Sequence, residues 1–124
     1  MSTLSMLIVD SNSDFSNVAS KYMLKNSIIK NIETCNKTQE ALEIAGRLKP
    51  DLILIELKLL HKVDTVFYQK LRAKVPGVII IGLTLYTYRF NNYDPSENKE
   101  IDAIISRNNF ADDIIQVVHS LSNH

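Results

Sequence analysis

Short, continuous apolar runs alternate with helix-like segments, and this alternation constrains the fold more than any other feature. The runs have the length of strands rather than helices. They are MLIV at 6–9, LILI at 52–55, VIII at 78–81 and AII at 103–105. A strand that is apolar at every position is buried on both faces, which is typical of a parallel sheet with helices on both sides.

The segments between the runs show helical spacing and helix boundaries. Apolar residues recur at three- and four-residue intervals over 15–23, after candidate N-caps at Ser11, Asn12 and Ser13. IIKNIETC at 28–35 is a weaker strand candidate, followed by Asn36 as an expected cap. Three further helices are expected, each with an apolar stripe along one face. The first ends before Pro50, with Ala41, Ile44, Ala45 and Leu48; the second ends before Pro76, with Val66, Phe67, Leu71 and Val75. The third follows the last apolar run, with Ile114, Val117, Val118 and Leu121.

This order predicts an α/β fold, a flavodoxin-like doubly wound five-stranded parallel sheet with strand order 2-1-3-4-5. One segment departs from the alternation, LYTYRFNNYDPSENKE at 85–100, where a helix is due between the fourth and fifth strands. Its helix propensity is poor. We therefore expect this fourth helix to be short or irregular, with most of the segment in a loop.

Composition and charge limit the functional classes. The 124 residues fit a single domain spanning 1–124. Fourteen basic and fourteen acidic side chains give a formal net charge of zero, so no field draws this domain to nucleic acid or to an anionic membrane. Cys35 is the only cysteine, and no apolar run approaches the roughly 20 residues of a membrane span. We expect a cytoplasmic protein that does not contact a membrane.

Polar residues follow the apolar segments LIV, LILI, VIIIGL and AIIS. They are Asp10, Glu56, Thr84 and Arg107. The carboxyl ends of parallel strands meet at one edge of the sheet, where ligands bind in this class of fold. A single polar residue at a strand end is ordinary, but four such residues together predict a site.

The same segments resemble a known family. LIVDSNSDF, KPDLILIELKL, VIIIGLT and DAIISRNNFADDII are similar to the four signature segments of the receiver domain of two-component response regulators. They occur in the same order, and the similarity extends over almost the whole chain. In that family an acidic pair binds Mg²⁺, an aspartate accepts a phosphoryl group from a histidine kinase, and a hydroxyl and a lysine contact that group.

Carried over by position, the resemblance implies two matches and several substitutions. Asp10 corresponds to the first acid of the pair and Thr84 to the hydroxyl. Ser11 replaces the second acid, Glu56 replaces the phosphoacceptor aspartate, and Arg107 replaces the lysine. Asp10 alone would support at most a weak Mg²⁺ site, since Mg²⁺ favours anionic oxygen ligands. No other cofactor is expected.

Glu56 is longer than aspartate by one methylene, which displaces its carboxylate from the position required for in-line attack. Leu85 stands where the family has a small residue, and Ile104 stands where it has a switch aromatic. These changes predict an atypical receiver, or pseudo-receiver, that is not an enzyme and acts through protein–protein interaction. Its expected partner is a histidine kinase or a downstream signalling protein.

Arg107 suggests another use of the pocket, because a guanidinium can hold a carboxylate with two parallel hydrogen bonds. We hypothesise an ion pair between Glu56 and Arg107, with the Thr84 hydroxyl donating to the same carboxylate. Glu56 would then imitate phospho-aspartate. The alternative is a relic site in which the pair only neutralises buried charge.

Two other functions compete with this interpretation. One is a conventional receiver that is still phosphorylated. The other is a flavodoxin-like binder of FMN or another phosphate, with DSNSD at a helix N-terminus; Asp10, Asp14 and the lack of glycines there oppose it. The histidines are too dispersed for a hydrolase; they are His61, His119 and His124.

Four aromatic residues in the irregular segment are candidates for an interface. They are Tyr86, Tyr88, Phe90 and Tyr93. Aromatic residues are enriched in interface cores, so they predict contact with a partner protein or a homodimer. The alternative is that they fold back over the core in place of the missing helix.

Overall fold

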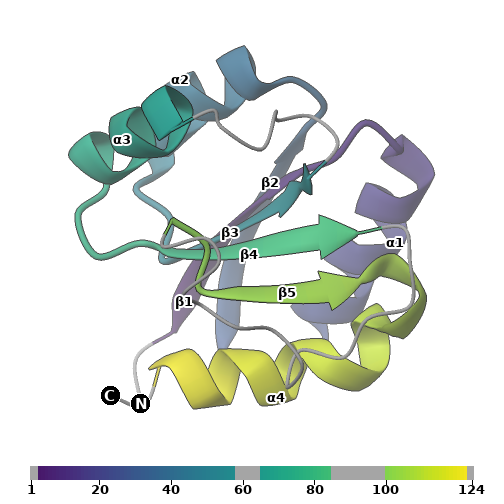
Figure 1. Cartoon of the computed structure of the whole chain (residues 1–124). Coiled ribbons are helices and arrows are strands. Elements are labelled where there is room, and N and C mark those ends of the chain that lie inside the picture. The colour runs from purple at the N-terminus through teal and green to yellow at the C-terminus, as the bar shows by residue number, and fades with distance from the viewer. Residues whose placement is uncertain (1–2, 58–64, 85–99, 123–124) are drawn as a thin grey trace.

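The computed structural model describes residues 3–57, 65–84 and 100–122. Five parallel strands form one sheet in the order β2-β1-β3-β4-β5, with helices on both faces (Figure 1). The strands are β1 Leu4–Val9, β2 Ile29–Cys35, β3 Leu52–Glu56, β4 Ile79–Thr84 and β5 Ala103–Ser106. The helices are α1 Ser13–Leu24, α2 Thr38–Leu48, α3 Thr65–Lys74 and α4 Phe110–Ser122, with a short 3-10 turn, η4, at Arg107–Asn109.

The alternation of side chains along each strand divides the core between the two faces of the sheet. Met6 and Ile8 of β1 pack in the cluster that includes apolar residues of α1 and α4. Leu7 and Val9 pack in the other cluster, with residues of α2 and α3. Because both sets of strand residues are buried, the continuous apolar runs are explained, and the predicted doubly wound α/β fold is confirmed.

The register of the strands places their carboxyl ends at one edge. Val9 pairs with Ile55 across β1 and β3, and Thr84 pairs with Ser106 across β4 and β5. The residues that follow or end these strands therefore share that edge. The order of the strands reverses between β1 and β3, which is where this class of fold places its ligands.

Some predicted boundaries are wrong. Asn12 caps α1 as expected, since its side chain accepts from the Phe15 amide at 3.0 Å. Asn36 does not cap α2: the N-cap is Lys37, without a side-chain cap bond, because the chain stays extended for one more residue. β3 includes Glu56 as its buried last residue, whereas the apolar pattern ended at Ile55.

Several sequence expectations fall outside the described residues. These are the short or irregular helix between β4 and β5 and the aromatic residues Tyr86, Tyr88, Phe90 and Tyr93. Leu85 also lies outside them. Within the described part of the chain, every helix is too short or too polar to cross a membrane.

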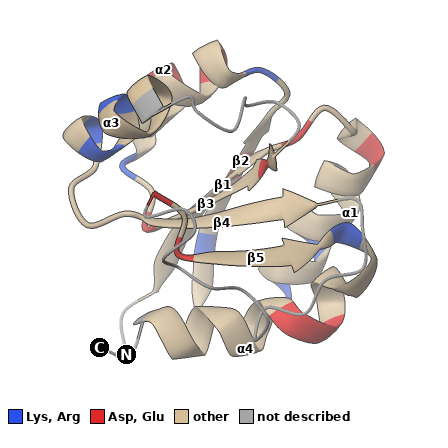
Figure 2. Ribbon diagram, in the orientation of Figure 1, with Lys and Arg blue, Asp and Glu red and all other residues tan. Residues whose placement is uncertain are grey.

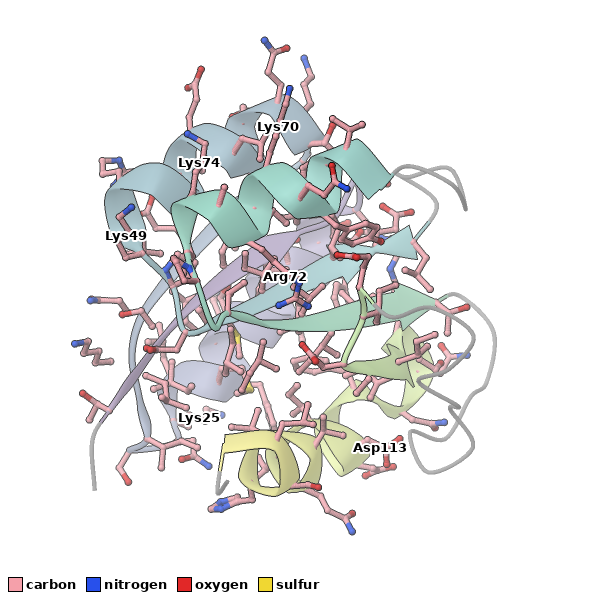
Figure 3. The ribbon with its side chains drawn as sticks, turned by 60° about the vertical axis from the view of Figure 1, so that its left-hand side comes forward. Lys25, Lys49, Lys70, Arg72, Lys74 and Asp113 are labelled. Atoms are coloured by element: carbon pink, nitrogen blue, oxygen red, sulfur yellow. The ribbon has the colours of Figure 1, made fainter. Side chains whose placement is uncertain are left out.

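Arg72 links α3 to the chain on either side of β4. Figure 3 shows this side chain reaching from the basic α3, whose charges are visible in Figure 2. Its guanidinium donates to the Val78 carbonyl at 2.9 Å and to the Glu100 carbonyl at 2.8 Å. Asp102 then accepts from the Ile80 amide at 2.8 Å. These bonds fix the start of β5, and hence the position of Arg107 beyond its end.

Gly82, in the middle of β4, gives a test of the packing. A Cβ built on Gly82 would lie 2.8 Å from Leu57 Cδ2, so the Leu57 side chain must move. We expect Gly82→Ala to lower the free energy of unfolding by about 1–3 kcal/mol, measured by urea denaturation.

The matched control is Gly46→Ala in α2, where the nearest atom to a new Cβ is 3.5 Å away. That change should stabilise the protein slightly, by about 0.5–1 kcal/mol, because alanine favours helix. A Leu57→Ala background should reduce the cost of Gly82→Ala, and an unchanged cost there would contradict the packing argument.

Candidate functional site

Asp10, Ser11, Glu56 and Arg107 meet at the carboxyl edge of the sheet. Asp10 and Ser11 follow β1, Glu56 ends the neighbouring β3, and Arg107 begins the η4 turn after β5. β4 lies between β3 and β5, so Arg107 must extend across the end of β4 to reach the acids. Only a long side chain can do this. The structure therefore joins four residues that the sequence placed at this edge.

The Arg107 guanidinium holds Asp10 with two hydrogen bonds. Nε donates to Asp10 Oδ2 at 3.0 Å, and Nη2 donates to Asp10 Oδ1. The Asn12 amide also donates to Asp10 Oδ1, at 2.8 Å. The Asp10 side chain is 0% exposed and that of Arg107 is 14% exposed, so this is a buried, bidentate ion pair.

Glu56 is held from two sides by its two carboxylate oxygens. Oε1 accepts from the Ser11 amide at 2.8 Å and from the Ser11 hydroxyl at 2.7 Å. Oε2 lies 3.2 Å from Arg107 Nη2. The hypothesised ion pair between Glu56 and Arg107 is therefore present. Its geometry differs from the expectation, because Ser11 occupies Oε1 and the bidentate partner of Arg107 is Asp10.

The three charged groups have shifted pKa values. Burial raises the pKa of Asp10, and the Arg107 hydrogen bonds and charge offset only part of that effect. Burial also opposes ionisation of Glu56, but the Ser11 hydrogen bonds and the Arg107 charge outweigh it and lower the pKa of Glu56. For Arg107, burial disfavours the charged form, yet contacts with Asp10 and Glu56 raise its pKa. Glu56 and Arg107 are thus both charged at neutral pH.

Thr84 lies at the same edge as this group, whereas Ile104 lies within β5, opposite Gly82. Thr84 ends β4, the strand between β3 and β5, and it is partly exposed at the same edge. Its predicted contact with the Glu56 carboxylate stays a prediction. Ile104, which the resemblance predicts at the position of the switch aromatic, is partly buried and packs against the cluster shared with α2 and α3.

Two contributions to the site were missed from the sequence. Ser11 was interpreted only as a lost acid, whereas it is the hydrogen-bond donor that orients Glu56. Phe15 was assigned to the core by its helical spacing. Its ring lies 5.6 Å from Arg107 Cζ and contacts Phe110 edge-on at 5.5 Å, so it also supports the guanidinium. The available signal was an aromatic residue in the first turn of the helix after β1, at the same edge of the sheet as the arginine that follows β5.

The residues at this edge fit Mg²⁺ poorly. Mg²⁺ requires several hard oxygen ligands in octahedral geometry. Here the Asp10 carboxylate is bound by a guanidinium, and the Ser11 hydroxyl is used as a donor to Glu56. Among the described residues, His, Cys, Asp and Glu form no group of three or more that could hold a metal ion. A positively charged Arg107 between the two acids would also repel a second cation.

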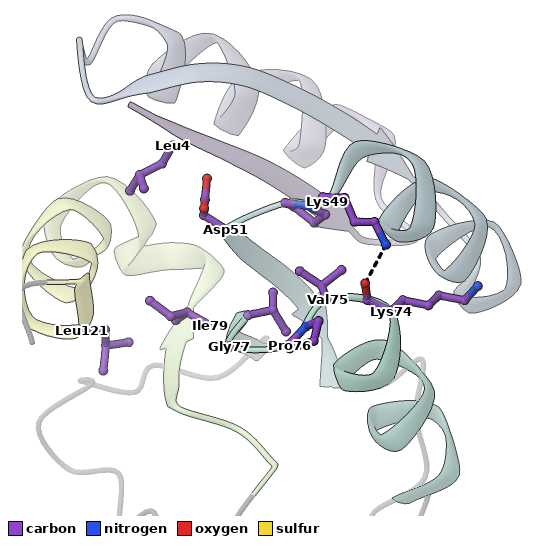
Figure 4. Close-up of a pocket in the computed structure, with 11 residues that line it drawn as sticks. Leu4, Lys49, Asp51, Lys74, Val75, Pro76, Gly77, Ile79 and Leu121 are labelled. Carbon is purple, nitrogen blue, oxygen red and sulfur yellow. Dashed lines mark hydrogen bonds between the residues drawn. The ribbon is translucent and has the colours of Figure 1, made fainter. Parts of the chain in front are cut away.

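Cavities lie at both edges of the sheet in the described part of the chain. The larger, about 590 Å³, lies at the opposite edge of the sheet, near the start of β3 and β4 (Figure 4). Lys49 borders it and donates from Nζ to the Lys74 carbonyl at 2.8 Å, which bridges the ends of α2 and α3. The smaller, about 250 Å³, borders Asp10. The larger cavity is therefore remote from the charged group.

No protein-family model matches the sequence. Solved structures of receiver domains are similar in fold, although their sequences differ widely from this one. The response regulator domain of Thermotoga maritima CheB is 16% identical with a TM-score of 0.75, and 98% of each chain is covered. A CheY-like receiver domain from Methylobacillus flagellatus is 14% identical with a TM-score of 0.74, covering 97% of this chain and 99% of that one.

A third similar structure carries an aspartate-to-glutamate mutation. It is a mutant of the receiver domain of the histidine kinase CKI1 from Arabidopsis thaliana, 18% identical, with a TM-score of 0.63 over 94% of this chain and 89% of that one. This chain therefore has the flavodoxin-like fold that CheY-like receiver domains share.

The lowered pKa of Glu56 predicts a pH-dependent contribution to stability. A carboxyl with a lowered pKa in the folded state stabilises fully above its ordinary pKa, and this stabilisation is lost as the pH falls through the folded-state value. We expect Glu56→Gln to lower the free energy of unfolding by about 1–3 kcal/mol at neutral pH. The deficit should shrink as the pH falls below about 4.

Urea denaturation of both proteins between pH 7 and pH 3 measures this deficit. Glu43→Gln, at an exposed position on α2, is the matched control and should show no deficit at any pH. A Glu56→Gln deficit that stays constant down to pH 3 would contradict a stabilising charge on Glu56.

Proposed function

We propose that this chain is a receiver-type module of two-component signalling that acts by protein–protein contact and does not depend on phosphorylation. The observation that carries the proposal is the position of Arg107. Its guanidinium contacts both Asp10 and Glu56, the two acids at the edge where receivers carry out phosphoryl transfer. The module is proposed to have no enzymatic activity and no Mg²⁺ requirement.

Arg107 supplies the positive charge of the pocket from within the chain. In receiver domains an acidic pair binds Mg²⁺, and metal ions neutralise the charge that develops during phosphoryl transfer. In this pocket one guanidinium is bonded to Asp10 at 3.0 Å and lies 3.2 Å from Glu56. Binding of Mg²⁺ would require breaking a buried, bidentate ion pair, which is costly because Arg107 would lose its partner. Arg107, a cation that belongs to the chain, therefore takes the place of an exchangeable Mg²⁺.

Glu56 is poorly placed to act as a nucleophile. One of its oxygens accepts two hydrogen bonds from Ser11, and the other faces Arg107. In-line attack requires a free carboxylate oxygen close to the phosphorus and aligned with the leaving group. Engagement of both oxygens, together with the lowered pKa of Glu56, reduces its reactivity. These contacts support a pocket that does not accept a phosphoryl group.

We further propose that Glu56 imitates the phosphorylated state. Its carboxylate is a permanent negative charge at the end of β3, and Arg107 links that charge to β5 and the η4 turn. A solved receiver with an aspartate-to-glutamate mutation, that of CKI1, keeps the same fold. The partner that recognises this state would be a histidine kinase or a downstream signalling protein.

The first experiment is an amide NMR titration with Mg²⁺ and then beryllofluoride, a mimic of aspartyl phosphate. We expect no saturable shifts in the wild-type protein. The variant Ser11→Asp/Glu56→Asp/Arg107→Lys should regain them, because it restores the second acid, the shorter acceptor and the weaker cation. Saturable shifts of the wild type around Asp10 and Glu56 would instead establish a conventional receiver.

The same triple variant tests the mimicry. Its spectra without and with beryllofluoride define the inactive and active positions of each amide. If Glu56 imitates phosphorylation, the wild-type amides in the C-terminal half of α4, away from the substituted Arg107, should match the active positions. Wild-type amides at the inactive positions would show that the site is a relic. Glu43→Gln is the control for non-specific shifts.

A further inference from the structure

The outer face of α1 carries apolar side chains that the fold leaves exposed. Among the described residues four large apolar side chains are exposed, and three of them lie on α1: Val18, Tyr22 and Leu24, at 68%, 36% and 54% exposure. Val18 and Tyr22 are four residues apart, so they lie on the same face of the helix. One exposed apolar residue is ordinary, but this grouping on a single helix indicates a contact surface.

Tyr22 is held in place before any partner binds. Its ring packs edge-on against Phe110 of α4, with 6.2 Å between the ring centres, and its hydroxyl donates to the Ala111 carbonyl at 3.0 Å. These contacts join α1 and α4, which cover the same face of the sheet (Figure 1). Because a fixed aromatic side chain loses little conformational entropy on binding, Tyr22 is suited to an interface.

Charged side chains of opposite sign flank this apolar pair along α1. Asp14 lies one turn before Val18, whereas Lys21 and Lys25 lie toward the C-terminal end of the same face. All three are exposed and form no ion pair within the part of the chain that the structure describes. At about 1.5 Å per residue, Asp14 precedes Val18 by about 6 Å, and the lysines follow it by about 4.5 and 10.5 Å.

A second copy of this chain complements that arrangement of charges. A two-fold axis beside Val18 places two α1 helices antiparallel, so the acidic end of each helix faces the basic end of the other. Asp14 then lies opposite Lys21 and Lys25 of the second copy, and the same pairing occurs twice around the two Val18 side chains. A parallel arrangement would place like charges together, which costs free energy.

We propose that the outer face of α1 is the interface of a homodimer, in which two copies pack Val18 and Tyr22 against each other in antiparallel helices. Asp14 of each copy pairs with Lys21 and Lys25 of the other. Two short helices bury less than the roughly 1,200–2,000 Å² of a stable interface, so the dimer is weak, with a Kd on the order of 10⁻⁴ M. The proposal does not rest on the signalling function proposed above, because the charged pocket uses different residues.

The test is sedimentation equilibrium of the full chain from about 10 µM to about 1 mM, a range that brackets the expected Kd. We expect a monomer–dimer equilibrium that weakens as NaCl is added, because the ion pairs are exposed. Val18→Asp places two acids beside the axis and should weaken the dimer at least about tenfold. The matched control is Val66→Asp on α3, where the valine is 56% exposed, and it should dimerise as the wild type does.

Charge reversal tests the antiparallel pairing. Asp14→Lys and the double variant Lys21→Glu/Lys25→Glu should each be monomeric over this range, because like charges then face each other. An equimolar mixture of the two variants should form a heterodimer, since one α1 face is then basic throughout and the other acidic. Glu43→Lys on α2, which covers the opposite face of the sheet, is the charge control and should dimerise normally.

Three results would overturn the proposal. The first is a wild-type protein that stays monomeric at the highest concentration, which would leave the α1 face to a different partner protein. The second is a dimer that survives Val18→Asp, because it then uses another surface, such as the aromatic residues at 86–93. The third is a mixture of the two charge-reversed proteins that does not associate, since Asp14 and the two lysines then do not meet.

Discussion

The buried ion pair between Asp10 and Arg107 determines the state of the whole carboxyl edge of the sheet. Asp10 has a wholly buried side chain, and a carboxylate in that position needs a partner in order to remain charged. Arg107 provides it and at the same time lies 3.2 Å from Glu56. Glu56 then completes its hydrogen bonding through Ser11. Each of these groups is therefore satisfied by the others, and the edge forms one closed network.

The residue types at this edge are better explained by this network than by considering each substitution on its own. A serine in place of an acid looks like a loss when it is considered alone. Next to Glu56 it is a donor, through both its amide and its hydroxyl, to a carboxylate that lies in a buried strand. Arginine in place of lysine is explained in the same way, because a planar guanidinium can bind Asp10 with two donors and still contact Glu56.

The sequence could predict the fold because most of its apolar runs have the length of strands and alternate with helical segments. Residues such as Ile53 and Leu54 are adjacent and both buried, as expected of a short strand in a sheet that is covered on both faces. The convergence of Asp10, Glu56 and Arg107 followed from the parallel topology alone. The choice of hydrogen-bond partners did not, because Arg107 could reach either acid. That choice depends on side-chain geometry, with Ser11 already occupying one oxygen of Glu56. The prediction that Asn36 caps α2 was wrong because one additional extended residue does not alter the spacing of the apolar residues in the helix.

Asp10 and Arg107 are 97 positions apart in the chain. During synthesis from the N-terminus, β1 and β3 are complete well before Arg107 emerges, and until then Asp10 lacks the cation that holds it in the folded protein. Closure of this edge therefore requires β5 and Arg107 to be in place. A nascent or truncated chain that ends before β5 would have two neighbouring acids at this edge without the guanidinium that contacts both of them once β5 is in place.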